Sequence, residues 1–96
     1  MRHPDSLLHV QNVHAGETIF LQGSPTLVIA VGYIHEDTDG AYASRLAIVP
    51  TLSLLFPFAV VNLIYNDEKH FWTTNARRTF PDIFTAVDNF KERNQP

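Results

Sequence analysis

Five histidines, at positions 3, 9, 14, 35 and 70, are the residues best suited to metal chemistry. Metal-binding histidines are usually two apart on a strand or three to four apart on a helix, and no pair here has that spacing. His35 precedes Glu36, Asp37 and Asp39, which together could hold zinc, but solvated turn residues explain the same pattern. We therefore predict no metal site and no cofactor.

Motifs for nucleophilic or nucleotide chemistry are missing from the sequence. The one Gly-Ser pair, at 23–24, runs into a proline instead of a nucleophile elbow, and the four glycines are scattered singly. The chain has no cysteine, which excludes thiolate catalysis and disulfides. Asp67, Glu68 and His70 cluster near an expected turn, where side chains are normally solvated instead of enclosed in a catalytic site. These observations favour a protein that is not an enzyme.

The segment KHFWTTNARRTF, residues 69–80, interleaves basic and aromatic side chains. Such a surface can bind a protein partner through an aromatic anchor and arginines, or stack nucleobases beside phosphates. Neighbouring side chains of a strand point to opposite faces, so one of Phe71 and Trp72 should be core and the other exposed. We predict a protein contact, with nucleic acid as an alternative, made by Lys69, His70, Trp72, Arg77 and Arg78.

Charge is unevenly distributed along the chain. The net charge is −3 and the pI about 5.9, which disfavours a generic binder of nucleic acid or anionic membranes. Residues 1–68 carry two bases and seven acids, a balance of −5, whereas residues 69–96 carry five bases and three acids, a balance of +2. The basic end therefore coincides with the predicted contact segment.

Ninety-six residues with 45% hydrophobic and 18% charged side chains predict one folded domain, 1–96. Strands are expected at 17–22, 26–35, 44–49, 58–65 and 70–74, separated by turn residues. The segment 80–94 reads as an amphipathic helix with Thr79 as a possible cap. Residues 4–15 fit a strand or a short helix, and the strand is preferred. The predicted fold is α+β: an antiparallel, strongly curved meander of about five strands with one C-terminal helix packed on it.

The stretch FAVVNLIY, residues 58–65, is apolar on both faces of the expected strand. One face would carry Phe58, Val60 and Ile64, and the other Val61 and Leu63. A strand that is apolar on both sides indicates a sheet covered above and below. The C-terminal helix can cover one face. The second cover is either the chain itself, by closure of the sheet or by the N-terminal and 50–57 segments, or a second copy of the protein, and we favour a homodimer.

A pocket inside the curved sheet is the other functional hypothesis, for a small-ligand binder or minor enzyme. Its polar groups would be Asn62 and Tyr65. Residues 46–65 are also uncharged over the length of a membrane span, but Pro50, Pro57 and the many β-branched residues favour strands. The polar N-terminus predicts no secretion signal. The overall expectation is a cytoplasmic, self-associating, non-enzymatic protein of adaptor or inhibitor type.

Overall fold

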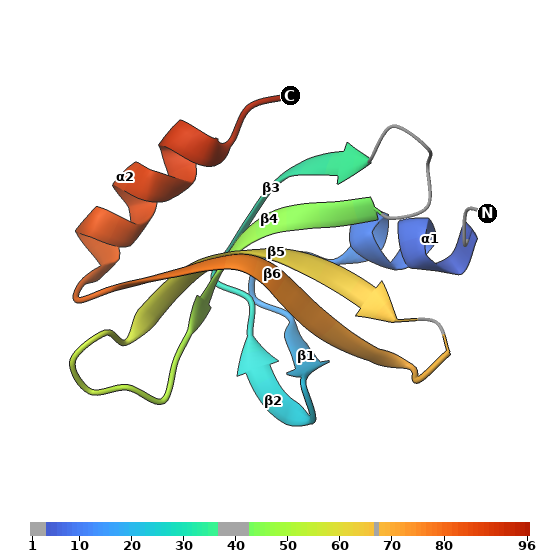
Figure 1. Ribbon diagram of the computed structural model, residues 1–96, viewed down its shortest axis with the longest axis horizontal. Helices are drawn as coiled ribbons and strands as arrows, with labels where there is room; N and C mark the ends of the chain where they lie inside the picture. The colour runs from blue at the N-terminus through green and yellow to red at the C-terminus, as the bar shows by residue number, and fades with distance from the viewer. Residues whose placement is uncertain (1–3, 37–42, 67) are drawn as a thin grey trace.

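The structure is a computed structural model that describes residues 4–36, 43–66 and 68–96. It is an α+β fold in which a mixed sheet is flanked by two helices (Figure 1). The helices are α1 (Pro4–Asn12) and α2 (Ile83–Arg93). The six strands are β1 (Thr18–Leu21), β2 (Ser24–Leu27), β3 (Ala30–Glu36), β4 (Ala43–Pro50), β5 (Phe58–Asn66) and β6 (Phe71–Phe80).

The sheet is strongly curved, as its topology requires. The strand order is β2-β1-β6-β5-β4-β3, so consecutive strands β2 and β3 lie at opposite edges. Across a flat sheet of six strands those edges would be about 24 Å apart, but the link from Leu27 to Ala30 spans at most about 10 Å. The sheet therefore curls until β2 approaches β4, and the Ile29 amide donates to the Ile48 carbonyl at 2.8 Å.

Two features of the predicted sheet are wrong. The expected strand 26–35 is two strands, because the chain leaves β2 at the buried Val28 and enters β3 at the opposite edge of the sheet. The sheet is mixed instead of antiparallel, since curling brings β1 beside the last strand, in parallel, at Leu21 and Trp72. Neither contact is local in sequence, so strand propensity could not predict it.

The N-terminal segment is helix α1, where we had preferred a strand. Leu7 and Val10, three residues apart, pack on the main core cluster, while Leu8 points into solvent. The alternation of Leu8 and Val10 therefore predicted the wrong element, whereas the three-residue spacing of Leu7 and Val10 is that of the observed helix.

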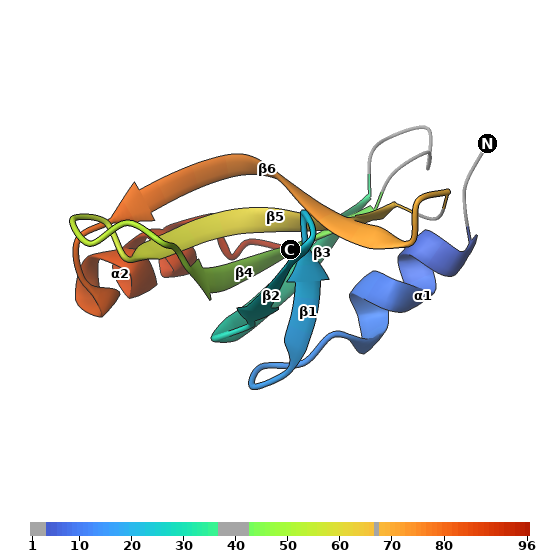
Figure 2. The ribbon, with the colours of Figure 1, turned by 90° about the horizontal axis from the view of Figure 1, so that it is seen from below.

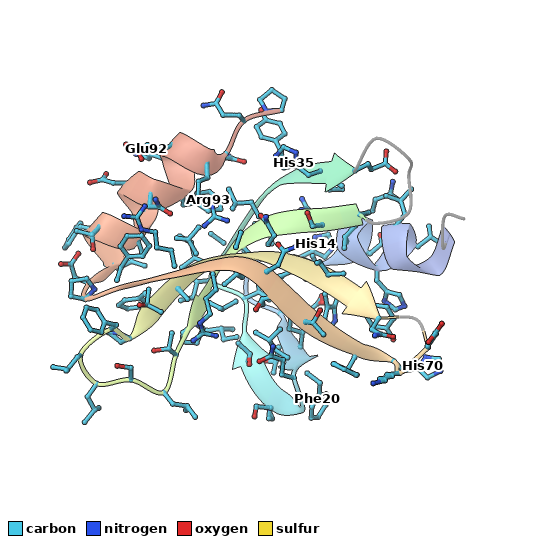
Figure 3. The ribbon with its side chains drawn as sticks, in the orientation of Figure 1. His14, Phe20, His35, His70, Glu92 and Arg93 are labelled. Carbon is cyan, nitrogen blue, oxygen red and sulfur yellow. The ribbon has the colours of Figure 1, made fainter. Side chains whose placement is uncertain are left out.

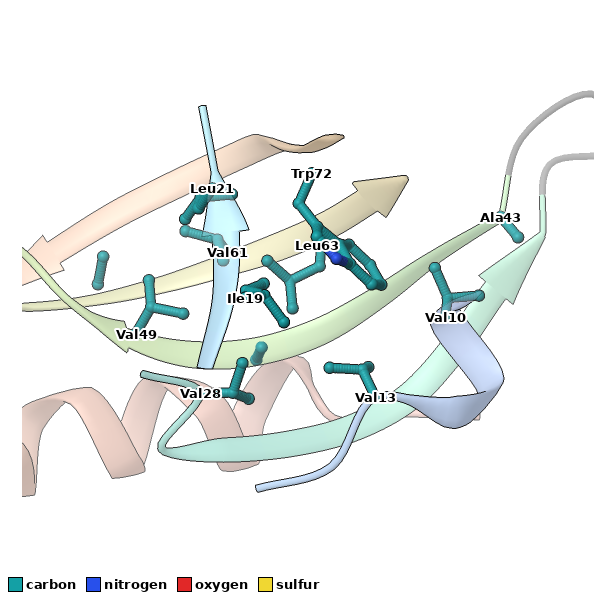
Figure 4. Close-up of a cluster of buried hydrophobic side chains, with 12 residues drawn as sticks. Val10, Val13, Ile19, Leu21, Val28, Ala43, Val49, Val61, Leu63 and Trp72 are labelled. Atoms are coloured by element: carbon teal, nitrogen blue, oxygen red, sulfur yellow. The ribbon is translucent and has the colours of Figure 1, made fainter. Parts of the chain in front are cut away.

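Both faces of the central strand are covered, as the sequence predicted for this region. Ala59, Val61 and Leu63 are fully buried on one face, in a cluster with residues of α1 and β1. Figure 4 shows Val61 and Leu63 in this cluster with Val10 and Ile19. Val60 is fully buried on the other face, where it clusters with α2. Beyond the reach of α2, Ile64 is half-buried. Because the chain supplies both covers, the apolar faces of β5 no longer call for a second copy.

Helix α2 packs through the apolar face predicted for it, with one exception. Ile83, Val87 and Phe90 lie against the second core cluster, but Phe84 is exposed. The cap is Asp82, whose Oδ1 accepts from the Thr85 amide at 2.8 Å. The expected Thr79 cap is wrong because β6 continues through Phe80.

Residues 46–65 form the end of β4, a connecting loop and β5, so the alternative of a membrane-spanning helix is wrong. Within the described parts of the chain, no helix is long and apolar enough to cross a bilayer.

Arg45 joins three elements from its place on β4. Its Nη1 donates to the carbonyls of Val10, Gln11 and Val13 at 3.0 to 3.2 Å, and its Nε donates to the Gly32 carbonyl at 2.9 Å. The first three carbonyls belong to the end of α1 and the residues after it, which have no helical amide to accept from. The guanidinium therefore fixes α1 to the sheet and to β3.

Gly32 lies where β3 passes closest to the end of α2. A Cβ at this position would collide with the Asn94 side chain and come within 3.1 Å of Phe90 Cζ. Asn94 Oδ1 accepts from the Tyr33 amide at 2.8 Å, so displacing it sacrifices that hydrogen bond. Gly32→Ala should destabilise the protein by about 1–2 kcal/mol in urea unfolding. In an Asn94→Ala background the same substitution should cost clearly less, and equal costs in the two backgrounds would contradict the proposed contact.

Asn89 is the buried polar residue of α2, with 9% of its surface exposed and its Oδ1 without a hydrogen-bond partner among the described residues. An unsatisfied buried amide is costly. Asn89→Leu should therefore stabilise the protein by about 1 kcal/mol in urea unfolding. Asp88→Leu, on the exposed side of the same helix, is the control for helix propensity, and an equal gain there would refute the burial argument.

Candidate functional site: an apolar loop and a groove at one end of the sheet

The connection between β4 and β5, residues 51–57, is the most apolar exposed part of the described molecule, and we call it the apolar loop. It projects beside the end of β6 and the start of α2, at the lower left of Figure 1 and the left of Figure 2. Leu52 and Leu54 are 101% and 98% exposed, Leu55 is 76% exposed, and Phe56 is also exposed. These leucines touch almost nothing in the chain itself.

The apolar loop is held in shape by its own polar groups. The Thr51 hydroxyl donates to the Phe56 carbonyl at 2.6 Å and accepts from the Ser53 amide at 3.1 Å. The Phe56 amide donates to the Ser53 hydroxyl at 3.1 Å, and the Thr51 amide donates to the Pro57 carbonyl at 2.8 Å. The leucines are thus presented on an ordered backbone, which lowers the entropy that a contact would have to overcome.

An open groove of about 600 Å³ runs between the apolar loop and the β1–β2 hairpin. It is lined by apolar and uncharged polar side chains, and among its described lining residues only Arg77 is charged. The lining residues are Leu21, Gln22, Ser24, Pro25, Thr26, Pro50, Thr51, Leu52 and Arg77. Without an imidazole or carboxylate among these residues, the groove is better suited to binding than to proton transfer.

Strand β6 borders the groove with an unpaired edge. In the described part of the chain, β1 pairs with β6 at Leu21 and Trp72, and no strand pairs with the outer side of residues 74–79. Figure 2 shows β1 reaching β6 near the centre, beyond which β6 continues to the left along the margin of the sheet. We call residues 74–79 the open edge.

The open edge contains a β-bulge. Asn75 pairs with Asn62 and Arg78 with Val60, which leaves Ala76 and Arg77 together opposite Val61. Ala76 has a φ of 50°, in the left-handed region that non-glycine residues rarely adopt. Bulges of this kind re-aim side chains at the margins of sheets and next to functional sites. Here the bulge directs Arg77 to the groove.

The predicted contact residues do not form one surface. Trp72 is only 7% exposed and packs in the core, with its ring 5.3 Å from Tyr65 and 6.2 Å from His9. This burial leaves little of the Trp72 ring for the predicted partner contact, because alternation placed the larger aromatic inward. Lys69 and His70 lie at the β5–β6 turn, separated from Arg77 by most of β6, about 20 Å or more.

The two arginines face opposite sides of the sheet. Arg77 lines the groove, whereas Arg78 pairs with Val60 on the α2 side, with its guanidinium 5.9 Å from the centre of the Phe80 ring. Arg93 donates from that side to the Val60 carbonyl at 3.1 Å. Burial, and secondarily the charge of Arg78, lower the pKa of Arg93 below its ordinary value. Arg77 is the member of the predicted pair that adjoins the groove.

The predicted pocket residues are also separated. The Asn62 side chain lies on the face of β5 that α2 partly covers. Tyr65 packs on the opposite face, against the main core cluster, and its ring is stacked on His9 with the ring centres 3.7 Å apart. Neither lines the groove. Because the two side chains face opposite ways, they cannot share a ligand pocket within the sheet.

The histidines are dispersed in the same way. His14 follows α1, His35 is near the end of β3, and His70 is at a turn (Figure 3). No group of three or more His, Asp or Glu side chains that could hold a metal occurs in residues 4–36, 43–66 and 68–96. Asp37 and Asp39 of the considered zinc site, as well as His3, lie outside the described residues.

The sequence analysis missed the exposure of the apolar loop. We considered residues 50–57 as a possible cover for the sheet because they are apolar, but a buried cover needs a periodic apolar face. Four large apolar residues in five positions, between two prolines and with Thr51 and Ser53 suited to local turns, were the available signal. Comparisons with known protein families, with curated proteins and with solved structures found no match.

Proposed function

We propose that this protein is a non-enzymatic interaction protein that self-associates through the apolar loop and binds another macromolecule at the adjoining groove. The observation that carries the proposal is the full exposure of Leu52 and Leu54 on a loop ordered by its own hydrogen bonds. Large exposed apolar patches on an ordered surface mark interaction sites.

The magnitude of the apolar contact supports a weak dimer. Burying Leu52, Leu54 and Leu55 from each of two copies would contribute roughly 9–18 kcal/mol at 1.5–3 kcal/mol per side chain. Association opposes this with a cost of about 4–15 kcal/mol. The midpoints of these two ranges differ by about 4 kcal/mol, which corresponds to a dissociation constant of about 1 mM. Phe56 of the apolar loop and Phe84 of α2 are also exposed, and Figure 1 shows this loop and the start of α2 at the same end of the molecule, so both rings can add to the contact area.

The other hypotheses receive less support from the geometry. Nucleic-acid binding through 69–80 needs clustered cations and an exposed aromatic, but Trp72 is buried and the cations lie at two ends and on two faces. A pocket built on Asn62 and Tyr65 would need them on one face. Protein binding by the apolar loop and the groove requires no rearrangement of the described surface.

Sedimentation equilibrium of the full chain over a concentration series tests the self-association. We expect the mean mass to rise from that of the 10.9 kDa monomer toward the dimer as the concentration approaches about 1 mM, the dissociation constant that the midpoint contact energy gives. A mass that stays at the monomer value up to the highest concentration would refute association through the loop.

A further inference from the structure

The groove and the open edge of β6 together resemble a site for an extended peptide. Unpaired strand edges bind extended segments by adding a strand, with main-chain hydrogen bonds providing affinity and neighbouring pockets providing specificity. Residues 74–79 offer about six positions, or roughly 20 Å, of such an edge. The groove lies beside them and is lined by Leu21, Pro25 and Leu52, which can receive an apolar side chain.

The charge of the groove lining indicates which kind of extended segment the groove can bind. Arg77 is the one charged residue among the described lining of the groove, and the bulge at Ala76 places it there. A guanidinium forms its strongest hydrogen bonds with a carboxylate. The charge complementary to this groove is therefore negative.

We propose that the groove and open edge bind an extended, acidic segment of a partner protein, which pairs with residues 74–79, places a carboxylate on Arg77 and inserts an apolar side chain beside Leu21 and Pro25. This inference rests on the proposed function and specifies its second part, the macromolecule bound at the groove.

A second copy of this chain is a poorer occupant of the open edge. Two β6 strands paired edge to edge would bring Arg77 and Arg78 of both copies together, and like charges opposed across strands are destabilising. A charged, bulged edge is a common protection against self-pairing. The positive charge of this edge favours a partner strand of opposite charge, which gives specificity by repelling the wrong occupant.

Panning a phage-displayed library of random 12-residue peptides against the full chain tests the proposal. We expect enriched peptides to combine acidic and apolar residues. A synthetic peptide of the enriched sequence should slow amide exchange at residues 74–79. Arg77→Glu should weaken its binding at least about 30-fold, because a charge-assisted hydrogen bond is replaced by repulsion. Arg78→Glu makes the same charge change on the opposite face, and it should weaken binding less than about fivefold at physiological salt.

Three results would overturn the inference: no enrichment, enriched peptides without acidic residues, or equal binding by the wild type and Arg77→Glu. Binding of a single-stranded 20-mer DNA with the same dependence on Arg77, in the absence of peptide binding, would assign the groove to nucleic acid instead. Sedimentation of the same samples separates the two proposals, since loop-dependent dimerisation without peptide binding rejects this inference alone. Peptide binding by a chain that stays monomeric rejects self-association alone.

Discussion

Replacing Leu52, Leu54 and Leu55 together with serine should leave the protein monomeric at concentrations up to about 1 mM, where the midpoint contact energy predicts that about half of the wild-type chains are dimeric. Each leucine contributes roughly 1.5–3 kcal/mol when it is buried in a contact, so the triple substitution removes most of the driving force for association. Sedimentation equilibrium of the variant and the wild type at matched concentrations measures the change.

The triple substitution should not destabilise the fold, because the three side chains are already exposed to water in the isolated chain. We expect the free energy of unfolding in urea to stay within about 0.5 kcal/mol of the wild-type value. The matched control replaces three apolar residues that are exposed elsewhere, Leu8, Phe20 and Leu27, with serine. If this control abolished association and the loop variant did not, the contact surface would lie on α1 and the β1–β2 hairpin instead of the apolar loop.

Arg45→Met should lower the free energy of unfolding by about 3 kcal/mol or more, the largest stability effect that we expect from a polar residue of this protein. Methionine retains the apolar stem of the side chain but leaves the carbonyls of Val10, Gln11, Val13 and Gly32 without their donor. Hydrogen bonds to charged groups contribute about 1.5–3 kcal/mol each, and four that share one guanidinium are not additive. Urea unfolding monitored by circular dichroism gives the difference.

Arg77→Met is the control for loss of one positive charge, because Arg77 is exposed and should change stability by no more than about 0.5 kcal/mol. Arg45→Lys, which is expected to fold even if Arg45→Met does not, keeps the charge without the fork of donors and should recover less than half of the loss. Amide exchange in α1 should accelerate more than in α2. A loss for Arg45→Met no larger than for Arg77→Met would show that this network does not hold α1 to the sheet.

The uncharged stretch that begins after Arg45 contains both buried and exposed apolar residues. Most of its residues in β4 and β5 are buried and provide the core of the sheet. Four of the seven residues between those strands are also large and apolar, yet all four are exposed. The difference in burial between similar side chains distinguishes the proposed interaction surface from the core.

Local pattern was sufficient for several parts of the fold. The two apolar faces of β5, the breaks at Pro50 and Pro57, and the apolar stripe of α2 each depend on the alternation or spacing of side chains within one element. The α+β class followed from them, because strands of this pattern and an amphipathic helix must cover one another. The inward position of one aromatic from the Phe71-Trp72 pair is also a local property of a strand.

Only the tertiary structure decided how the elements meet and what remains outside. The curl of the sheet brings β1 beside β6, lets α1 cover the face for which we had favoured a second copy, and leaves the outer edge of residues 74–79 without a partner strand in the described part of the chain. The bulge at Ala76 then places Arg77 on the groove side of the sheet. These outcomes depend on contacts between residues far apart in the chain, whose free energies local periodicity does not contain. For that reason the sequence determined which residues are apolar enough to form a core, and the packing determined that Leu52 and Leu54 are not buried in it.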